Sequence, residues 1–273
     1  MIRRTLLLTT ALLLVSAARL AAHDLYIKLD TFFAFPGDTL RVPLLNGTFT
    51  RSENSVTRDR VSNLSVVGPD GVTQPPPNME WNSAGDTTVF RVPTRKSGTY
   101  VIGLSTMPRE IKLAGGAFNS YLREEGIDNI LARRTARGEL GRAARERYSK
   151  NAKAIVQIGD DRSDGYKTPL GYPAEIVALD NPYEGQRSGK LRVQCLVDRE
   201  PAAGLQVIVG SQRAGQKPIE TRLRTDKQGI ATIPLNRSGR WYVRFVKMVP
   251  ASGSGVDYES KWATLTFQIG HAP

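Results

Sequence analysis

The first part of the chain alternates apolar and polar residues in short runs, and this period of two predicts half-buried β-strands. Turn sequences separate the runs, with PGD at 36–38 and GPDG at 68–71, where proline and glycine favour tight reversals. Short strands at this spacing predict a β-sandwich. The runs are DLYIKLDTFFAF at 24–35, TLRVPLL at 39–45, TTVFRVP at 87–93 and GTYVIGLST at 98–106.

The last part of the chain, residues 190–269, shows a similar alternation in six candidate strands. TDKQG at 225–229 is a tight-turn sequence, because Asp226 can bond to the local backbone and Gly229 can adopt a positive φ angle. This pattern predicts a second sandwich of immunoglobulin-like or prealbumin-like type. The candidate strands are KLRVQCLVD, GLQVIVGSQ, ETRLRTD, IATIPL, RWYVRFVKM and WATLTFQIG.

Residues 117–150 have a different pattern, in which apolar residues recur near helical spacing and proline is absent. Gly126, Gly138 and Gly141 are expected to divide the segment into two or three short helices. We therefore predict a helical segment here. The apolar positions that define it are Phe118, Tyr121, Leu122, Ile127, Ile130 and Leu131.

These patterns together predict a mainly β protein with two β-sandwich domains, residues 23–188 and 189–273. The helical insertion at 117–150 lies in or after the first sandwich. Strand patterns resume at 152–159 and 174–180, and we expect these two strands to complete the first sandwich.

The N-terminus has the three parts of a secretory signal peptide, which we expect to cover residues 1–22. Arg3 and Arg4 precede an apolar run at 5–18, and small residues follow it. Cleavage after Ala22 would make His23 the first residue of the mature chain, whereas cleavage after Ala21 is the alternative. We therefore expect a periplasmic or secreted protein. No other apolar run approaches 18 residues, so no transmembrane segment is expected after cleavage.

The net charge of the chain indicates which kinds of partner it can bind. The formal charge is +12, which favours anionic partners, although the basic residues are spread along the chain. Eight basic and two acidic residues lie between 133 and 153, and they form either a solvated helix face or a docking surface for an acidic envelope partner. Nucleic acid is not expected as a partner, because the chain is exported and has no recognition motif.

The sequence does not indicate an enzyme. A serine or cysteine triad needs a histidine held by a carboxylate, and the two histidines, His23 and His271, both lie near chain ends. Phosphate-binding glycine loops, paired-cysteine metal clusters and dinucleotide fingerprints are missing from the sequence. The single cysteine, Cys195, has no intramolecular disulfide partner and is expected to be a small apolar residue on a strand.

Several segments, in this order, resemble the DUF4198 family from His23 to about Gln268. The resemblance implies an exported bacterial protein with two sandwiches and a mature N-terminus that begins with histidine, often as HE or HD, like His23-Asp24 here. Some members are labelled as nickel-uptake or cobalt-uptake accessory proteins of the NikM or NikK type. Lys247 is a departure, because a histidine is expected there. The segments are FNSYLREEGIDNILARR, ERYSKNAKAIVQIG, PLGYPAEIVALDNPY, TDKQGIATIPL, GRWYVRFVKMVP and DYESKWATLTF.

An N-terminal histidine is suited to binding a metal. Its α-amine titrates near pH 8, and the amine and the ring Nδ1 can close a six-membered chelate on one ion. Nitrogen ligands of this kind suit Ni²⁺ or Cu²⁺, and the resemblance adds Co²⁺. Asp24, Glu259 and His271 are the candidate additional ligands, although His271 lies three residues from the C-terminus and Glu259 can instead pair with a lysine or arginine.

Three hypotheses remain open. The first is a non-enzymatic metal-binding protein, anchored at His23, that delivers the metal ion to a membrane transporter. The second is an envelope interaction or adhesion module that binds no metal and docks through Arg133, Arg134 and Arg137. The third is an oxidative copper enzyme, which requires His271 to lie beside His23. In the simplest alternative, His23 begins the first strand and binds nothing.

Overall fold

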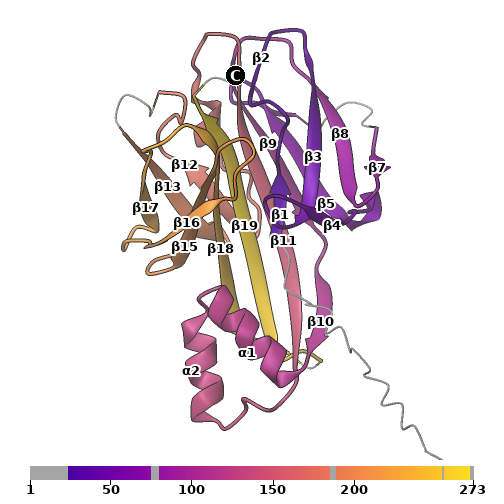
Figure 1. Ribbon diagram of the computed structural model, residues 1–273, viewed down its shortest axis with the longest axis vertical. Helices are drawn as coiled ribbons and strands as arrows, with labels where there is room; N and C mark the ends of the chain where they lie inside the picture. Colours follow the sequence, from indigo (N-terminus) through magenta and orange to yellow (C-terminus); the bar gives the residue numbers. More distant parts are fainter. Residues whose placement is uncertain (1–23, 75–79, 185–188, 254, 271–273) are drawn as a thin grey trace, which may run out of the picture.

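The computed structural model describes residues 24–270 except 75–79, 185–188 and 254. In this part of the chain, most regular structure is β, arranged in three sheets, and two α-helices pack at one end (Figure 1). The prediction of a mainly β protein built from sandwiches is confirmed. The described helices are not long and apolar enough to cross a membrane.

The largest sheet has ten strands and draws them from both halves of the chain. Strand β11 pairs in parallel with β19, in a register that runs from Glu146 opposite Tyr258 to Ala154 opposite Thr266. The pairing therefore crosses the boundary expected at residue 188. In spatial order the strands are β16 (Ile219–Arg224), β15 (Gln206–Gln212), β18 (Gly239–Pro250), β19 (Tyr258–Ile269), β11 (Ala144–Ile158), β9 (Gly98–Thr106), β5 (Val61–Val67) and β6 (Thr73–Gln74), and β10 (Arg109–Leu113) and β2 (Phe33–Ala34) also pair with β11.

Two smaller sheets pack against the ten-stranded sheet. The first comprises β1 (Asp24–Ile27), β3 (Thr39–Gly47), β8 (Thr87–Pro93), β7 (Asn82–Ala84) and β4 (Ser52–Asn54). The second comprises β12 (Ala174–Ala178), β13 (Lys190–Val197), β14 (Glu200–Pro201) and β17 (Ile230–Pro234). The expectation that residues 174–180 complete the first sandwich is wrong, because β12 pairs with β13 instead.

The two small sheets cover opposite faces of the large one. Successive residues of a strand point to opposite faces, so β11 can serve both cores. Ala154 and Val156 pack in the core that contains the first small sheet, whereas Ile155 packs in the core that contains the second. The arrangement has three layers, and its central layer is buried on both sides where the small sheets overlap.

The helices α1 (Gly115–Glu124) and α2 (Asp128–Ala136) form the predicted insertion. They pack on the far ends of β18 and β19 through a cluster that includes Phe118, Leu122, Met248 and Trp262 (Figure 1). The helical prediction for 144–150 is wrong, because these residues begin β11. Their backbone groups are satisfied by β10 on one side and β19 on the other, and this pairing replaces helical bonds.

The expectation for Cys195 is confirmed, because it is a buried strand residue. The turn at 225–229 forms as expected. The Asp226 carboxylate accepts hydrogen bonds from the backbone N–H groups of Gln228 and Ile230, and Gly229 has a φ of 71°.

Candidate functional site

The four residues predicted as metal ligands have different outcomes. His23 and His271 lie outside the residues that the structure describes. Asp24 is the first described residue, and Glu259 lies on β19. The site can therefore be built from Asp24, the immediate neighbour of the predicted chain start.

Asp24 begins β1 and is firmly placed. Strand β1 pairs with β3, and the hydroxyl group of Thr264 on β19 donates a 2.6 Å hydrogen bond to the backbone oxygen of Leu25. The Asp24 carboxylate is buried, and it accepts a 2.9 Å hydrogen bond from the Tyr26 hydroxyl group. Burial raises the pKa of Asp24, although the positive charge of Arg244 opposes the shift.

Asp24 lines a pocket of about 560 Å³ that collects carboxylates from four segments. The pocket lies between the start of β1, the loop after β3, the end of α1 and the strands β16 and β18. Five of its lining residues are acidic and two are basic, although the whole chain carries a formal charge of +12. We call it the acidic pocket. Its ionisable residues are Asp24, Glu53, Glu124, Glu125, Glu220, Lys217 and Arg244, together with the phenols Tyr26 and Tyr242.

Arg244 lies at the base of the acidic pocket and contacts three of its carboxylates. Its Nη1 atom lies 3.4 Å from the Asp24 carboxylate and bonds directly to Glu125, and its Nη2 atom lies 3.9 Å from Glu220. Burial, with a further contribution from Asp24, raises the pKa of Glu125 to about 7. The guanidinium thus holds together acidic groups that would otherwise repel one another.

Three aromatic rings form an apolar side of the acidic pocket. The ring centre of Tyr26 lies 5.3 Å from those of Phe49 and Tyr242, and the Phe49 and Tyr242 centres are 4.4 Å apart. The Tyr242 hydroxyl group donates a 2.6 Å hydrogen bond to Glu220. Packing among the three rings holds the hydroxyl groups of Tyr26 and Tyr242 in place. These hydroxyl groups in turn orient the carboxylates of Asp24 and Glu220.

The structure does not bring Glu259 to Asp24. Glu259 forms a 3.2 Å ion pair with Arg147, which is the alternative to metal binding that the sequence suggested for this residue. It lies five residues before Thr264, the β19 residue that contacts β1, and this separation corresponds to about 17 Å along a strand at about 3.3 Å per residue. Lys247 stands where the family resemblance suggested a histidine. It lies on β18 directly opposite Lys261 of β19 in the strand register.

The acidic pocket does not form a complete metal site from the described side chains. Among the residues that the structure describes, no group of three or more histidine, cysteine, aspartate or glutamate side chains could hold a metal ion. A metal ion there would need nitrogen ligands from the chain start. The donor set of an N-terminal histidine, an amine and an imidazole, fits that requirement beside Asp24.

Glu125, Glu220 and Arg244 were not predicted from the sequence. Glu125 directly follows α1, Glu220 lies on β16 and Arg244 lies on β18, and only the fold brings them together. One signal was available for Arg244. In the strand pattern RWYVRFVKM it is a charged residue between apolar neighbours, and a charge inside a buried strand requires a partner.

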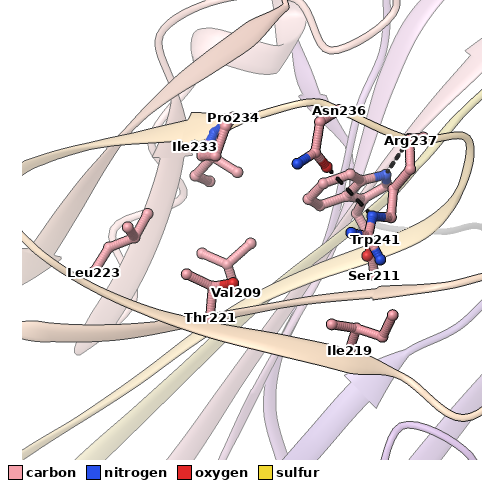
Figure 2. Close-up of a pocket in the computed structure, with 10 residues that line it drawn as sticks. All are labelled: Val209, Ser211, Ile219, Thr221, Leu223, Ile233, Pro234, Asn236, Arg237 and Trp241. Carbon is pink, nitrogen blue, oxygen red and sulfur yellow. Dashed lines mark hydrogen bonds between the residues drawn. The ribbon is translucent and has the colours of Figure 1, made fainter.

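A smaller pocket of about 50 Å³ lies at the open side of the second sandwich (Figure 2). Its side chains come from β15, β16, β17 and β18, and Val209, Leu223 and Ile233 supply its apolar walls (Figure 2). The Trp241 Nε1–H donates to the backbone oxygen of Arg237 at 3.3 Å, which closes one end. The charged groups needed for binding an ion are sparse here, so the acidic pocket is the better candidate site.

Comparison with protein families supports the resemblance seen in the sequence. Residues 20–248 match the family model described as "Domain of unknown function (DUF4198)". The chain belongs to the DUF4198 family. No curated protein matches the chain.

Solved structures with some similarity to this DUF4198 protein include a DUF4785 family protein from Legionella pneumophila, with 10% identity over 80% of this chain and a TM-score of 0.25. The chain spans half of the length of that protein. The D0-D1 domain of intimin has 11% identity, covers 89% of this chain and 97% of its own, and has a TM-score of 0.23. The BSP domain of a biofilm-associated protein has 13% identity, with 88% and 29% covered and a TM-score of 0.20. Similarity this low supports no conclusion about function.

Proposed function

We propose that this DUF4198 protein is an exported, non-enzymatic binding protein whose cargo is a divalent transition-metal ion, Ni²⁺, Co²⁺ or Cu²⁺. One observation carries the proposal. The acidic pocket gathers five carboxylates beside Asp24 on a chain with a formal charge of +12. Carboxylates this concentrated on a basic protein attract cations to a pocket lined by Asp24, the residue after the expected chain start.

The nitrogens of His23 supply the binding in this proposal, and the pocket supplies the charge. The Asp24 carboxylate already interacts with Tyr26 and Arg244, so it is an electrostatic partner rather than a free ligand. Glu124 and Glu220 are exposed at the rim of the pocket, where Glu220 also accepts the hydrogen bond from Tyr242. A site with few protein ligands releases its ion readily, which suits delivery to a membrane transporter.

The test compares two forms of the protein without its signal peptide. One form begins at His23 and the other carries one alanine before it, and isothermal titration calorimetry measures their affinity for Ni²⁺ and Cu²⁺. We expect the added alanine to weaken binding at least tenfold, because it removes the amine from the chelate. Equal affinity of the two forms would refute the site. Mass spectrometry of the exported protein establishes whether His23 is the natural first residue.

Two matched substitutions test whether carboxylates of the acidic pocket contribute more to metal binding than carboxylates elsewhere on the surface. Glu220→Gln removes one rim carboxylate of the acidic pocket and is expected to weaken metal binding severalfold. Glu259→Gln removes a carboxylate that pairs with Arg147 on another part of the sheet, and it is expected to leave binding unchanged. An equal effect of both substitutions would show that the pocket has no special part in binding.

A second candidate function is an envelope interaction module that binds through the helical insertion. Arg133 and Arg137 on and after α2 are exposed, which supports this candidate, but Arg134 is buried and holds the insertion together. Only the exposed pair can therefore test it. Arg133→Glu with Arg137→Glu is expected to abolish salt-sensitive capture of an anionic envelope polymer. Capture that is unchanged by the substitutions and by salt would exclude this role.

A further inference from the structure

A pocket of about 150 Å³ lies on the other side of β1 and β3 from the acidic pocket, and it has the opposite charge. Leu25 and Asn46 line it, whereas their chain neighbours Asp24 and Gly47 line the acidic pocket, as expected for strand residues that point alternately to two faces. We call it the basic pocket. It has no aspartate or glutamate among its lining residues, and its ionisable side chains are Arg60, Arg109, Tyr148 and Lys150.

Lys150 places its ammonium group inside the protein, and no carboxylate of the described residues forms an ion pair with it. The residue is 9% exposed, and its Nζ atom donates a 2.8 Å hydrogen bond to Asn46 Oδ1. Within the described part of the chain, Lys150 forms no ion pair, and its Nζ lies 5.5 Å from the centre of the Tyr148 ring. Burial lowers the pKa of Lys150 to about 8, with Asp24 and Glu146 opposing the shift, so the group is charged at neutral pH.

Two arginines, Arg60 and Arg109, also line the basic pocket and add to its positive charge. The Arg60 Nε atom is buried and has no hydrogen-bond partner among the described residues, and its Nη2 atom donates to the Met107 backbone oxygen at 3.3 Å. Arg109 is exposed at the pocket mouth and forms no ion pair in the part of the chain described. A buried guanidinium without an opposite charge is costly, and an anion in the pocket would offset the positive charge that the arginines and Lys150 share there.

The geometry points to the basic pocket as a binding site for a small oxyanion of the phosphate or sulfate type, held by Lys150, Arg60 and Arg109. The three cations come from three separate segments, namely η1 (Arg58–Arg60), the start of β10 and the middle of β11. Donors that approach from several directions suit a tetrahedral oxyanion, and guanidinium groups bind such oxygens with paired donors. The volume is below the range of about 300–1,000 Å³ that is usual for drug-sized ligands, which favours a single small group.

The test is calorimetric titration of the folded protein, without its signal peptide, at pH 7 with inorganic phosphate and with sulfate. Lys150→Met is expected to weaken phosphate binding at least tenfold, and Arg109→Gln severalfold. Arg109 is exposed, so its substitution leaves folding intact and keeps the test valid if Lys150→Met does not fold. Lys227→Met is the matched control, because Lys227 is an exposed lysine in the turn before β17. The Lys227→Met protein is expected to bind phosphate with the affinity of the wild type.

Sedimentation with phosphatidylglycerol vesicles distinguishes a lipid headgroup from a free ion as the source of the oxyanion. If the vesicles capture the protein and Arg109→Gln weakens this capture, the oxyanion is a lipid headgroup. If inorganic phosphate binds saturably and the vesicles do not capture the protein, the oxyanion is a free ion. The proposal is overturned if phosphate and sulfate give no saturable heat at millimolar concentration and the vesicles capture nothing. It is equally overturned if binding or capture occurs but Lys150→Met and Arg109→Gln leave it unchanged.

Discussion

Lys153 on β11 and Glu175 on β12 form a 2.7 Å ion pair that is buried from both sides, with side chains 3% and 1% exposed. The pair joins the central sheet to the second small sheet. Glu175 also accepts hydrogen bonds from the backbone N–H groups of Leu170, at 2.6 Å, and Gly171, at 3.0 Å, so its charge is fully compensated. Burial lowers the pKa of Lys153, and the charge of Glu175 opposes the shift.

We predict that Glu175→Gln lowers the free energy of unfolding by about 3–5 kcal/mol, because it leaves the Lys153 charge buried without its partner. Urea denaturation measures the change. Adding Lys153→Met to Glu175→Gln is expected to recover part of the loss, since it removes the unpaired charge. Asp198→Asn breaks the more exposed pair with Lys261 and is expected to cost about 1 kcal/mol or less. Equal costs for the two single substitutions would contradict the argument.

Arg134 is predicted to be essential for the helical insertion. It is 1% exposed, its Nε atom donates to Asn119 at 3.0 Å, and its Nη2 atom donates to the backbone oxygens of Glu139 at 2.7 Å and Arg142 at 2.6 Å. Arg134→Met removes the donor from the buried Asn119 Oδ1 and from two partly buried backbone oxygens, which is expected to lower the free energy of unfolding by about 3 kcal/mol. Urea denaturation and protease cleavage between α2 and β11 measure the effect.

The neighbouring Arg133 is the control for this prediction. It is exposed on the same helix, so Arg133→Met is expected to change the free energy of unfolding by less than about 0.5 kcal/mol. Similar behaviour of the two variants would show that the insertion does not depend on the buried guanidinium.

Stability is predicted to fall as the pH rises through the range in which Glu125 titrates. The ordinary pKa of this glutamate is 4.5, and burial raises the pKa to about 7 in the folded protein. Between these values the folded state binds more protons than the unfolded state, so the contribution is complete below pH 4.5 and is lost as the pH rises through about 7. Urea denaturation in the presence of a chelator, from pH 4.5 to 7.5, measures the slope.

Glu125→Gln removes the titrating group and is expected to reduce this loss of stability across the same pH range. Glu259→Gln, at a carboxylate outside the acidic pocket, is the control and is expected to retain the wild-type slope. An unchanged slope in Glu125→Gln would show that other groups account for the pH dependence.

Cys195 is predicted to react with thiol reagents only after the protein unfolds. The residue is 0% exposed in the core of the second sandwich, and burial raises the pKa of its thiol. Ellman's reagent is expected to give no colour with the native protein at pH 8 and one equivalent of thiol in concentrated urea. Rapid reaction under native conditions would show that the sandwich opens on the time scale of the assay.

The sequence predicts most of the strands because their patterns are local. Runs such as 87–93 and 98–106 alternate and are bounded by turns, and they form β8 and β9 at the predicted positions. Residues 144–150 were misjudged for a physical reason. Burial alternates only over the first three, with Ala144 and Glu146 buried and Arg145 exposed, and a glutamate at a buried position disguises the period of two.

Pairing between distant strands could not be predicted in the same way. Arg147 and Glu259 are 112 residues apart, and nothing local in either segment indicates that β11 and β19 lie side by side. The acidic pocket has the same origin. Asp24 was predicted from the sequence because it follows His23, the expected first residue, whereas Glu125, Glu220 and Arg244 are brought beside it only by the three-layered fold.

The position of β19 has a consequence for the order of events during biogenesis. This last strand packs Leu265 and Phe267 into one core, and its Thr264 and Thr266 hydroxyl groups bond to β1 on the opposite face. Neither core is complete until β19 has emerged from the ribosome. A nascent chain therefore keeps both cores open until β19 has been synthesised, which suits the export proposed above because a narrow translocation pore admits only an unfolded chain.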